Sequence, residues 1–290
     1  MADTIAVTMC VKNEDCFVWY ALMSIVDWAD KILIYDTGSD DNTVKIIQSV
    51  IDSKPEYKEK ITFEERGPVT KEDYKNLRQE QYEKCGCDWA FVVDGDEIWW
   101  KESLDEMRSI IERDKDVRLI GSPFYNCCGD VFHYRKSERD VFILKGYLND
   151  GKETPYTTHG AVSCHCVSRK IPGVHCNGNY GLDGKYDIDN DTLYDGKYKM
   201  IFTNGHFFHT SYCKRSSSAK GNFFTLGRRR KYLLGYDYKF DSDFKFPEVF
   251  YREDRPSFVP SPFDTKITVI RKIANVGINF IKIIRNKVGK

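Results

Sequence analysis

The first hundred residues alternate short apolar runs with polar stretches of helical composition, and this alternation strongly constrains the fold. It predicts strands at 4–11, 31–35, 61–64 and 89–93, and helices at 16–29, 44–53 and 71–84. Strands and helices that alternate in this way predict an α/β domain with a mostly parallel sheet and helices on both faces. In open sheets of this kind, ligands bind beyond the carboxyl ends of the strands.

An acidic cluster, Asp94-Gly95-Asp96-Glu97, follows directly on the last of these apolar runs. Several carboxylates at the end of a buried strand cost free energy unless a cation lies beside them. Their hard oxygens suit Mg²⁺ or Mn²⁺, and the glycine permits a close approach of the backbone. A single acidic turn can also be a solvated loop, so its neighbours decide between the two interpretations.

Polar side chains also end the first and second predicted strands, at Asn13, Glu14 and Asp36. Because the carboxyl ends of parallel strands meet at one edge of a sheet, these residues should share a crevice with the acidic cluster. A divalent cation held by carboxylates commonly leaves one face open to substrate phosphates. A nucleoside diphosphate is therefore the expected ligand.

Three motifs, at residues 9–15, 27–43 and 89–97, carry a resemblance to a known family. In this order and spacing they resemble the family 2 glycosyltransferases of GT-A fold, in particular the bacterial lipopolysaccharide-core glucosyltransferase type. The resemblance covers residues 4–100. It implies a Rossmann-like, mostly parallel sheet, a nucleotide-diphosphate sugar donor and a Mn²⁺ or Mg²⁺ cofactor.

The same resemblance implies roles for residues that match the family motifs. Val11, Lys12, Asn13 and Glu14 would line the pocket for the base and ribose, and Asp36 would form a hydrogen bond with the base.

The acidic cluster matches the DxD element of the family. Asp96 would bind the metal directly, while Asp94, with Gly95 between them, would lie nearer the ribose and the sugar and is a further possible ligand. Arg78 falls where relatives often show an Arg-Asn pair on the preceding helix, although Gln79 replaces the asparagine. The alternative for Arg78 is an exposed helix arginine.

The second half of the chain departs further from the family. Relatives often carry a Val-His-Glu element, whereas this chain has Val174, His175 and Cys176, which leaves the base in that loop unassigned. His209, with Ser211 two residues later, is the candidate third metal ligand or diphosphate contact, since imidazole completes many carboxylate-bound Mn²⁺ sites. Each histidine could instead be a structural residue.

No spacing selects the catalytic base, so the catalytic residues remain unknown. The candidates lie in one acidic stretch that could equally be an exposed loop: Asp183, Asp187, Asp189 and Asp191. A basic run at 214–231 follows the histidine segment, and Arg228 or Arg229 could close over the diphosphate. A membrane-facing or solvated surface is the equal alternative.

We expect a glycosyltransferase domain at 1–257, with a nucleotide-binding half at 1–100 and an acceptor half at 101–257. Residues 258–290 form a second expected unit. A proline-punctuated linker at 258–263 precedes apolar residues at helical spacing, with Lys and Arg but no acid after residue 264. This pattern predicts an amphipathic helix that lies on anionic lipid through 264–290. Packing on the catalytic domain is the alternative.

The whole sequence therefore predicts a metal-dependent, inverting glycosyltransferase that acts on a glycan or lipid-linked acceptor. We expect reduced cysteines, no nucleic-acid partner, and a cytoplasmic protein peripheral on the cytoplasmic face of a membrane. Two alternatives are a sugar-nucleotide nucleotidyltransferase and a catalytically inactive GT-A scaffold. The former usually has a glycine-rich, arginine-bearing loop where this chain has residues 12–15.

Overall fold

The computed structural model describes residues 2–135, 143–149, 153–157, 162–176, 187–188, 196–216, 236, 238–267, 269 and 272–273. The elements of the first part are β1 (Ile5–Val11), α1 (Val18–Ile25), β2 (Lys31–Asp36), α2 (Thr43–Ile51), α3 (Pro55–Lys60), β3 (Ile61–Glu65), α4 (Lys71–Lys84), β4 (Trp89–Val92), β5 (Glu97–Trp99) and α5 (Lys101–Arg113). Those of the second part are β6 (Val117–Cys128), β7 (His133–Arg135), β8 (Ile143–Leu148), β9 (Glu153–Thr157), β10 (Val162–Ser168), β11 (Val174–His175), β12 (Asp187–Ile188), β13 (Lys199–Phe202), β14 (Phe207–Tyr212), β15 (Tyr238–Lys239), and the 3₁₀ helices η2 (Glu248–Tyr251) and η3 (Pro262–Asp264).

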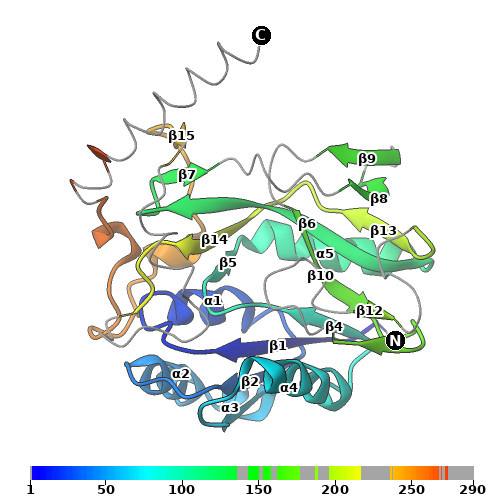
Figure 1. Cartoon of the computed structure of the whole chain (residues 1–290), viewed down its shortest axis with the longest axis horizontal. Coiled ribbons are helices and arrows are strands. Elements are labelled where there is room, and N and C mark those ends of the chain that lie inside the picture. Colours follow the sequence, from blue (N-terminus) through cyan, green and yellow to red (C-terminus); the bar gives the residue numbers. More distant parts are fainter. Residues whose placement is uncertain are drawn as a thin grey trace.

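The central sheet has the strand order β3-β2-β1-β4-β10-β6-β13-β8-β9 (Figure 1). The pairs β1·β2, β2·β3 and β1·β4 are all parallel, with Val7 opposite both Ile32 and Phe91. The chain adds β2 and β3 on one side of β1 and then returns to place β4 on the other side. In sheets with such a reversal, ligands bind beyond the carboxyl ends of the two strands that flank it, here β1 and β4.

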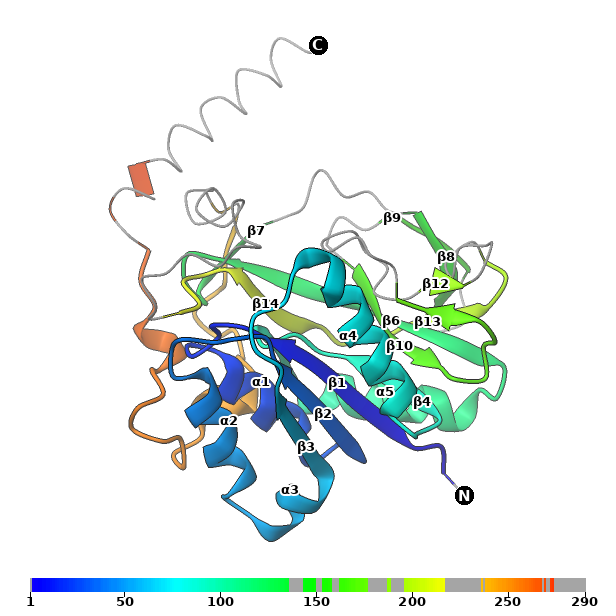
Figure 2. The same ribbon diagram turned by 60° about the horizontal axis from the view of Figure 1, so that its bottom comes forward.

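Helices cover both faces of the parallel strands, as the alternation in the sequence predicts (Figure 2). Successive side chains of a strand point to opposite faces. In β1, Ile5, Val7 and Met9 pack in the cluster that contains α1 and α2, whereas Ala6 and Cys10 pack on the side of α4. The α/β class with a mostly parallel central sheet is therefore confirmed.

Most elements begin and end within one or two residues of the expected bounds, but the first helix differs more and one helix was not expected. The first helix, Val18–Ile25, is shorter than 16–29 at both ends. The amides of Phe17 and Val18 donate to the carbonyl of Glu14 in the turn before α1, and those of Trp28 and Ala29 donate to the carbonyl of Ile25 in the turn after it. A further helix, α3, was not expected; it begins at Pro55, whose fixed backbone angle suits the first turn of a helix.

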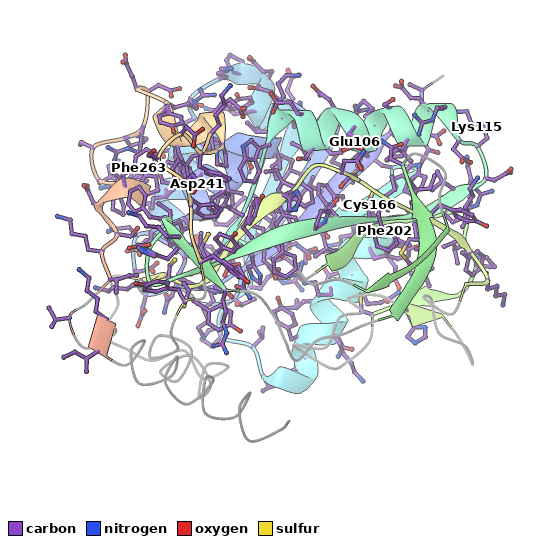
Figure 3. The ribbon with its side chains drawn as sticks, turned by 90° about the horizontal axis from the view of Figure 1, so that it is seen from above. Glu106, Lys115, Cys166, Phe202, Asp241 and Phe263 are labelled. Atoms are coloured by element: carbon purple, nitrogen blue, oxygen red, sulfur yellow. The ribbon has the colours of Figure 1, made fainter. Side chains whose placement is uncertain are left out.

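A smaller group of strands, β5, β14, β6, β7 and β15, is joined to the central sheet through β6. β6 pairs with β10 through residues 119–123 and with β14 through residues 124–128, so one long strand belongs to both groups. β14 also pairs antiparallel with β5, and β7 pairs with β6 and β15. The helix α5 is fixed to this part because Glu106, labelled in Figure 3, accepts the amides of Asn204 and Gly205 at 3.0 and 2.9 Å.

Residues 258–263, the expected linker, pack against the preceding part of the chain. Val259 is fully buried, and the hydroxyl of Tyr20 donates to the carbonyl of Pro260 at 2.9 Å. The ring of Phe263, labelled in Figure 3, lies 5.9 Å from that of Phe132 and 5.8 Å from that of Phe250. The domain boundary after residue 257 stays a prediction.

The expected amphipathic helix lies almost entirely outside the described residues. Of its apolar positions, Ile267 is buried, whereas Ile273 is 68% exposed. Within the described ranges, none of the helices combines the length and apolar character needed to cross a membrane.

Candidate functional site

The acidic cluster forms a tight turn between β4 and β5. The amide of Asp94 donates to Oε2 of Glu97 at 2.9 Å, and the amide of Glu97 donates to the carbonyl of Asp94 at 3.1 Å. Glu97 is only 2% exposed. The third acid of the cluster therefore closes the turn that presents Asp94 and Asp96.

Gly95 lies where no side chain fits. A Cβ atom at this position would lie 2.9 Å from Cγ of Glu14 and 3.2 Å from Cγ1 of Val11. The first distance is shorter than real Cβ contacts, so a larger residue would displace the turn or the end of β1. The glycine thus permits a close approach between the turn and the loop after β1.

Arg78 on α4 braces the first aspartate of the turn. Its Nη2 lies 2.6 Å from Oδ1 of Asp94 and also donates to the hydroxyl of Tyr74 at 3.0 Å. The arginine side chain is 6% exposed, and that of Asp94 is 31% exposed. Arg78 is thus a buried partner of the cluster, contrary to the alternative of an exposed helix arginine.

His209 reaches the turn through the pairing of β14 with β5. In this antiparallel pair His209 is opposite Glu97, so its side chain comes beside Asp96, and Nε2 lies 3.7 Å from Oδ2 of Asp96. The amide and hydroxyl of Thr210 both donate to the carbonyl of Asp96, at 2.9 and 3.1 Å. Strand pairing therefore sets the position of both the aspartate and the histidine.

Asp96 and His209 are suitably placed to share a divalent ion. Metal bonds of about 2.1 Å to oxygen and nitrogen can span the 3.7 Å between Oδ2 and Nε2. No cluster of three or more His, Cys, Asp or Glu side chains in the described ranges is arranged to hold a metal by itself. The donor set thus fits an ion that takes its remaining ligands from substrate phosphates or water.

Arg215 is a buried member of this site that the sequence did not single out. Its Nη1 lies 2.6 Å from Oδ2 of Asp96, and its Nη2 pairs with Oε1 of Glu14. All three side chains are at least nine-tenths buried. In the sequence, Arg215 belongs to the basic run at 214–231, and no local pattern distinguishes it from the exposed Lys214.

The backbone around Arg215 is fixed to the first half of the chain. The carbonyl of Arg215 accepts the amide of Cys16 at 3.1 Å, and the hydroxyl of Ser216 donates to Oδ2 of Asp41 at 2.7 Å. We call residues 214–216 the strap, because they cross from the end of β14 to the loops that follow β1 and β2.

Asp36 and Asn13 organise the loop that follows β2. Oδ1 of Asp36 accepts the amides of Gly38 and Ser39 at 3.0 Å. Asn13 has a positive φ of 53°, accepts the amide of Asp40 through Oδ1 at 2.9 Å and donates its own amide to the hydroxyl of Ser39. These two side chains, both almost buried, shape the wall of the expected base pocket.

The other residues expected to line this pocket lie at different depths. Val11 and Glu14 are 1% and 3% exposed and pack beneath the acidic turn, whereas Lys12 is partly exposed. The carbonyl of Val11 accepts the amide and hydroxyl of Thr37. Val11 and Glu14 are therefore buried next to the acidic turn, and Lys12 is the more exposed residue of this loop.

The segment of His175 and Cys176 lies against α4. The amide of Cys176 donates to Oε1 of Gln79 at 2.9 Å, so the residue that replaces the expected asparagine holds this segment. Nδ1 of His175 lies 3.2 Å from the carbonyl of Gly173. Burial raises the pKa of the Cys176 thiol to about 12, so it is protonated at neutral pH.

Several candidates from the sequence cannot be placed. Asp183, Asp189, Asp191, Arg228 and Arg229 lie outside the described residues. Asp187 is opposite His175 in the short pair of β11 and β12, which places its backbone next to that histidine.

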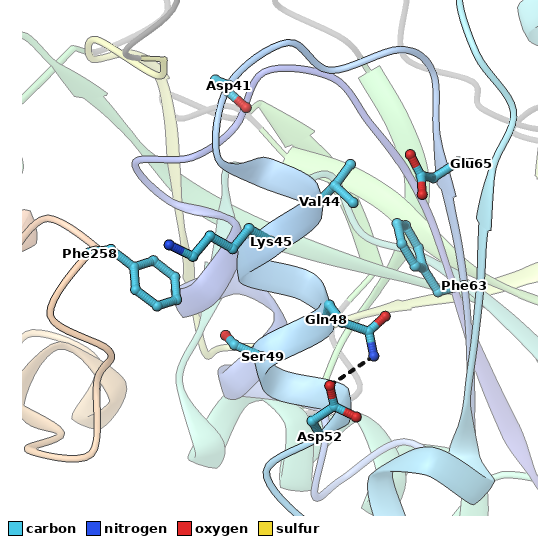
Figure 4. A pocket seen from close by; sticks show the side chains of 9 residues that line it. All are labelled: Asp41, Val44, Lys45, Gln48, Ser49, Asp52, Phe63, Glu65 and Phe258. Atoms are coloured by element: carbon cyan, nitrogen blue, oxygen red, sulfur yellow. Dashed lines mark hydrogen bonds between the residues drawn. The ribbon is translucent and has the colours of Figure 1, made fainter.

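An open depression of about 800 Å³ runs along α2 (Figure 4), and no residue of the acidic turn lines it. Lys45 lies 4.1 Å from the ring centre of Phe258, and Gln48 donates to Asp52 at 3.0 Å. The depression shares only its Asp41 end with the strap. It contains none of the residues that converge at the ends of β1 and β4.

Comparisons with known proteins agree with the motifs. The sequence model of the family described as Glycosyl transferase family 2 matches residues 6–171. The search of curated proteins found no match.

The chain is also similar, at low identity, to several solved structures. TarS from S. aureus is 13% identical, with a TM-score of 0.46, over 71% of this chain and 36% of that structure. The mannosyltransferase PcManGT from Pyrobaculum calidifontis, in complex with GDP-Man and Mn²⁺, is 14% identical, with a TM-score of 0.46. This similarity covers 100% of this chain and 77% of that structure. Glucosyl-3-phosphoglycerate synthase from Mycobacterium tuberculosis, in complex with Mn²⁺ and UDP-Glc, is 19% identical, with a TM-score of 0.33. This similarity covers 42% of this chain and 44% of that structure.

The chain spans only about a third of TarS. The family match, by contrast, spans more than half of the chain and includes the loops after β1, β2 and β4. The chain therefore belongs to glycosyl transferase family 2.

Proposed function

We propose that this protein is a metal-dependent, inverting glycosyltransferase of the hexosyltransferase type. It moves a sugar from a nucleoside-diphosphate donor to a hydroxyl group of a glycan or glycolipid. The observation that carries this proposal is the convergence of Asp94, Asp96 and His209 at the carboxyl ends of β1 and β4. That place is where sheets of this type bind nucleotides.

Asp96 and His209 would hold Mn²⁺ or Mg²⁺, with Asp94 as a further candidate ligand. When bound, the ion supplies positive charge that stabilises the departing diphosphate. The carboxylate of Asp94, which Arg78 holds in one orientation, would lie near the ribose and the sugar. Gly95 lets the turn pack closely against Glu14 and Val11, which keeps Asp94 and Asp96 at the end of β1.

The loop after β2 would receive the base of the donor. Asp36 and Asn13 already fix the backbone of residues 38–40 by hydrogen bonds, which reduces the entropy lost when a ligand binds there. We propose that Asp36 contacts the base and that Lys12 lines the same pocket from its partly exposed position.

An inverting transfer needs a base that removes the proton of the attacking hydroxyl. Cys176 does not serve this purpose, because its thiol stays protonated at neutral pH. The acidic stretch that contains Asp183, Asp187, Asp189 and Asp191 is the proposed source of the base. Of these four residues, Asp187 is the one within the described ranges, and its backbone lies opposite His175.

A panel of nucleotide sugars, assayed for Mn²⁺-dependent release of the nucleoside diphosphate, tests this proposal. Asp96→Asn should abolish the release with every donor, while Asp116→Asn, at an exposed acid, should leave it unchanged. No turnover with any donor would favour the inactive scaffold. Formation of a nucleotide sugar from a nucleoside triphosphate and a sugar phosphate would instead indicate a nucleotidyltransferase.

We also propose that residues 264–290 hold the protein on the cytoplasmic face of a membrane. The segment carries Lys and Arg but no acid after Asp264, and each such charge near anionic lipid contributes about 1 kcal/mol. Because Ile267 is buried, a chain that ends after residue 267 keeps the packed part intact. It should sediment less with anionic vesicles than the full chain, and equal sedimentation would refute the membrane role.

A further inference from the structure

Arg215 bridges two buried carboxylates at the centre of the site. Its Nη1 contacts Oδ2 of Asp96 at 2.6 Å, while Nη2 pairs with Glu14. Asp96 is 1% exposed, and the side chains of Glu14 and Arg215 are 3% and 8% exposed. Burial of two carboxylates at this depth requires a cation, and a guanidinium with two parallel donors suits this task.

The oxygen that Arg215 contacts is the one that faces His209. Oδ2 of Asp96 lies 2.6 Å from Arg215 and 3.7 Å from Nε2 of His209. An ion held between Asp96 and His209 would therefore bind the same oxygen atom as the guanidinium. Two cations at one carboxylate oxygen repel each other strongly in a buried site.

We propose that Arg215 is a positioning residue whose guanidinium occupies the Asp96 carboxylate in the metal-free protein. It holds the Asp96 carboxylate in one orientation, and it gives up its contact with Oδ2 when the ion binds. Glu14 retains the guanidinium after this exchange, so neither charge is left without a partner. This inference rests on the proposed metal role of Asp96.

The strap allows this exchange without a large movement of the backbone. The backbone of Arg215 is hydrogen-bonded to Cys16, and the next residue, Ser216, is tied to Asp41. A rotation of the arginine side chain towards Glu14 is therefore enough to release Asp96. Metal binding would then be opposed by the loss of one charge-assisted hydrogen bond.

Titration with Mn²⁺ alone, followed by the electron paramagnetic resonance of the free ion, tests the competition. Arg215→Met should bind Mn²⁺ at least about tenfold more tightly than the wild type, because hydrogen bonds between charged groups contribute on that scale. The metal-free variant should melt at a lower temperature, and Mn²⁺ should raise its melting temperature more than that of the wild type. Unchanged or weaker Mn²⁺ affinity in the folded variant would overturn the inference.

Lys214→Met is the matched control, because it removes the same charge from the exposed neighbouring residue. It should change the Mn²⁺ affinity far less than Arg215→Met does. An equal gain in affinity would show that the effect comes from the lost positive charge in general and not from the contact with Asp96. If Arg215→Met does not fold, Arg215→Lys keeps a charge but cannot bridge both acids as a fork. The Arg215→Lys variant should still bind Mn²⁺ more tightly than the wild type. If it bound Mn²⁺ with the same affinity as the wild type, the proposal would be contradicted.

Asp96→Asn separates this inference from the proposed function. If Asp96→Asn and the wild type bind Mn²⁺ equally, the metal role of Asp96 fails, and the role of Arg215 fails with it. If Asp96→Asn loses Mn²⁺ but Arg215→Met gains nothing, only the inference about Arg215 fails.

Discussion

Nε2 of His209 lies 3.7 Å from Oδ2 of Asp96, although the two residues come from opposite halves of the chain. The antiparallel pairing of β14 with β5 makes this contact, because it places His209 opposite Glu97, the neighbour of Asp96. Thr210 adds two hydrogen bonds to the carbonyl of Asp96. This pair of short strands thus brings a residue of the second half of the chain to the acidic turn of the first half.

Arg78→Met should weaken the binding of nucleoside diphosphate in the presence of Mn²⁺ by roughly tenfold or more. The substitution removes the guanidinium 2.6 Å from Asp94 and leaves that carboxylate without its buried cation. Isothermal titration calorimetry measures the affinity. Lys75→Met, at an exposed position of the same helix, is the control and should bind as the wild type does. Equal affinities for the two variants would argue against a brace at Arg78.

Gly95→Ala should destabilise the protein by about 1–3 kcal/mol, the usual cost of an added methyl group in a packed site. The new Cβ would lie 2.9 Å from Cγ of Glu14, so the turn or the loop after β1 must shift. Urea unfolding followed by circular dichroism gives the change in stability. An unchanged midpoint would show that the turn has room that the structure does not provide.

Cys176→Ala should leave the pH profile of sugar transfer unchanged between pH 6 and 9. Burial raises the pKa of this thiol to about 12, so the thiol remains neutral across that range and contributes no titration. The rate of nucleoside diphosphate release, measured with saturating donor, gives the profile. A profile that loses one limb in the variant would identify Cys176 as a titrating group in the reaction.

Glu80 should make the protein more stable above pH 4.5 than at pH 3. Arg66 foremost, together with Lys84 and Tyr35, lowers the pKa of Glu80 to about 2 from the usual 4.5. The native state therefore binds the proton less readily than the unfolded state, and the contribution disappears as the pH falls from 4.5 towards 2. Because the side chain is 30% exposed, solvent screening limits the effect to about 1–2 kcal/mol.

Urea unfolding of the wild type and Glu80→Gln at pH 7, 4.5 and 3 measures this contribution. The difference in stability between the two proteins should be largest at pH 7 and should narrow at pH 3. A constant difference between the wild type and Glu80→Gln at all three pH values would contradict the assignment.

The sequence by itself determined the parallel half of the sheet and the position of the acidic turn. Apolar runs that end in polar residues place Asn13, Asp36 and Asp94 at the carboxyl ends of three strands, and the order of the elements brings these ends together. Such patterns are local, because a strand is recognised from a few consecutive residues. Gly95 could be identified in the same way, as the small residue between two acids.

Only the tertiary structure decided which of the charged residues form the centre of the site. In the folded chain Glu97 closes the turn with a hydrogen bond, and Arg78 forms an ion pair with Asp94. Arg215 forms ion pairs with Asp96 and Glu14. In the sequence, Arg215 is one basic residue in a basic run, and nothing local separates it from Lys214. The physical reason is that ion pairs between distant residues depend on burial and strand register, which the folded chain sets and no short stretch of sequence records.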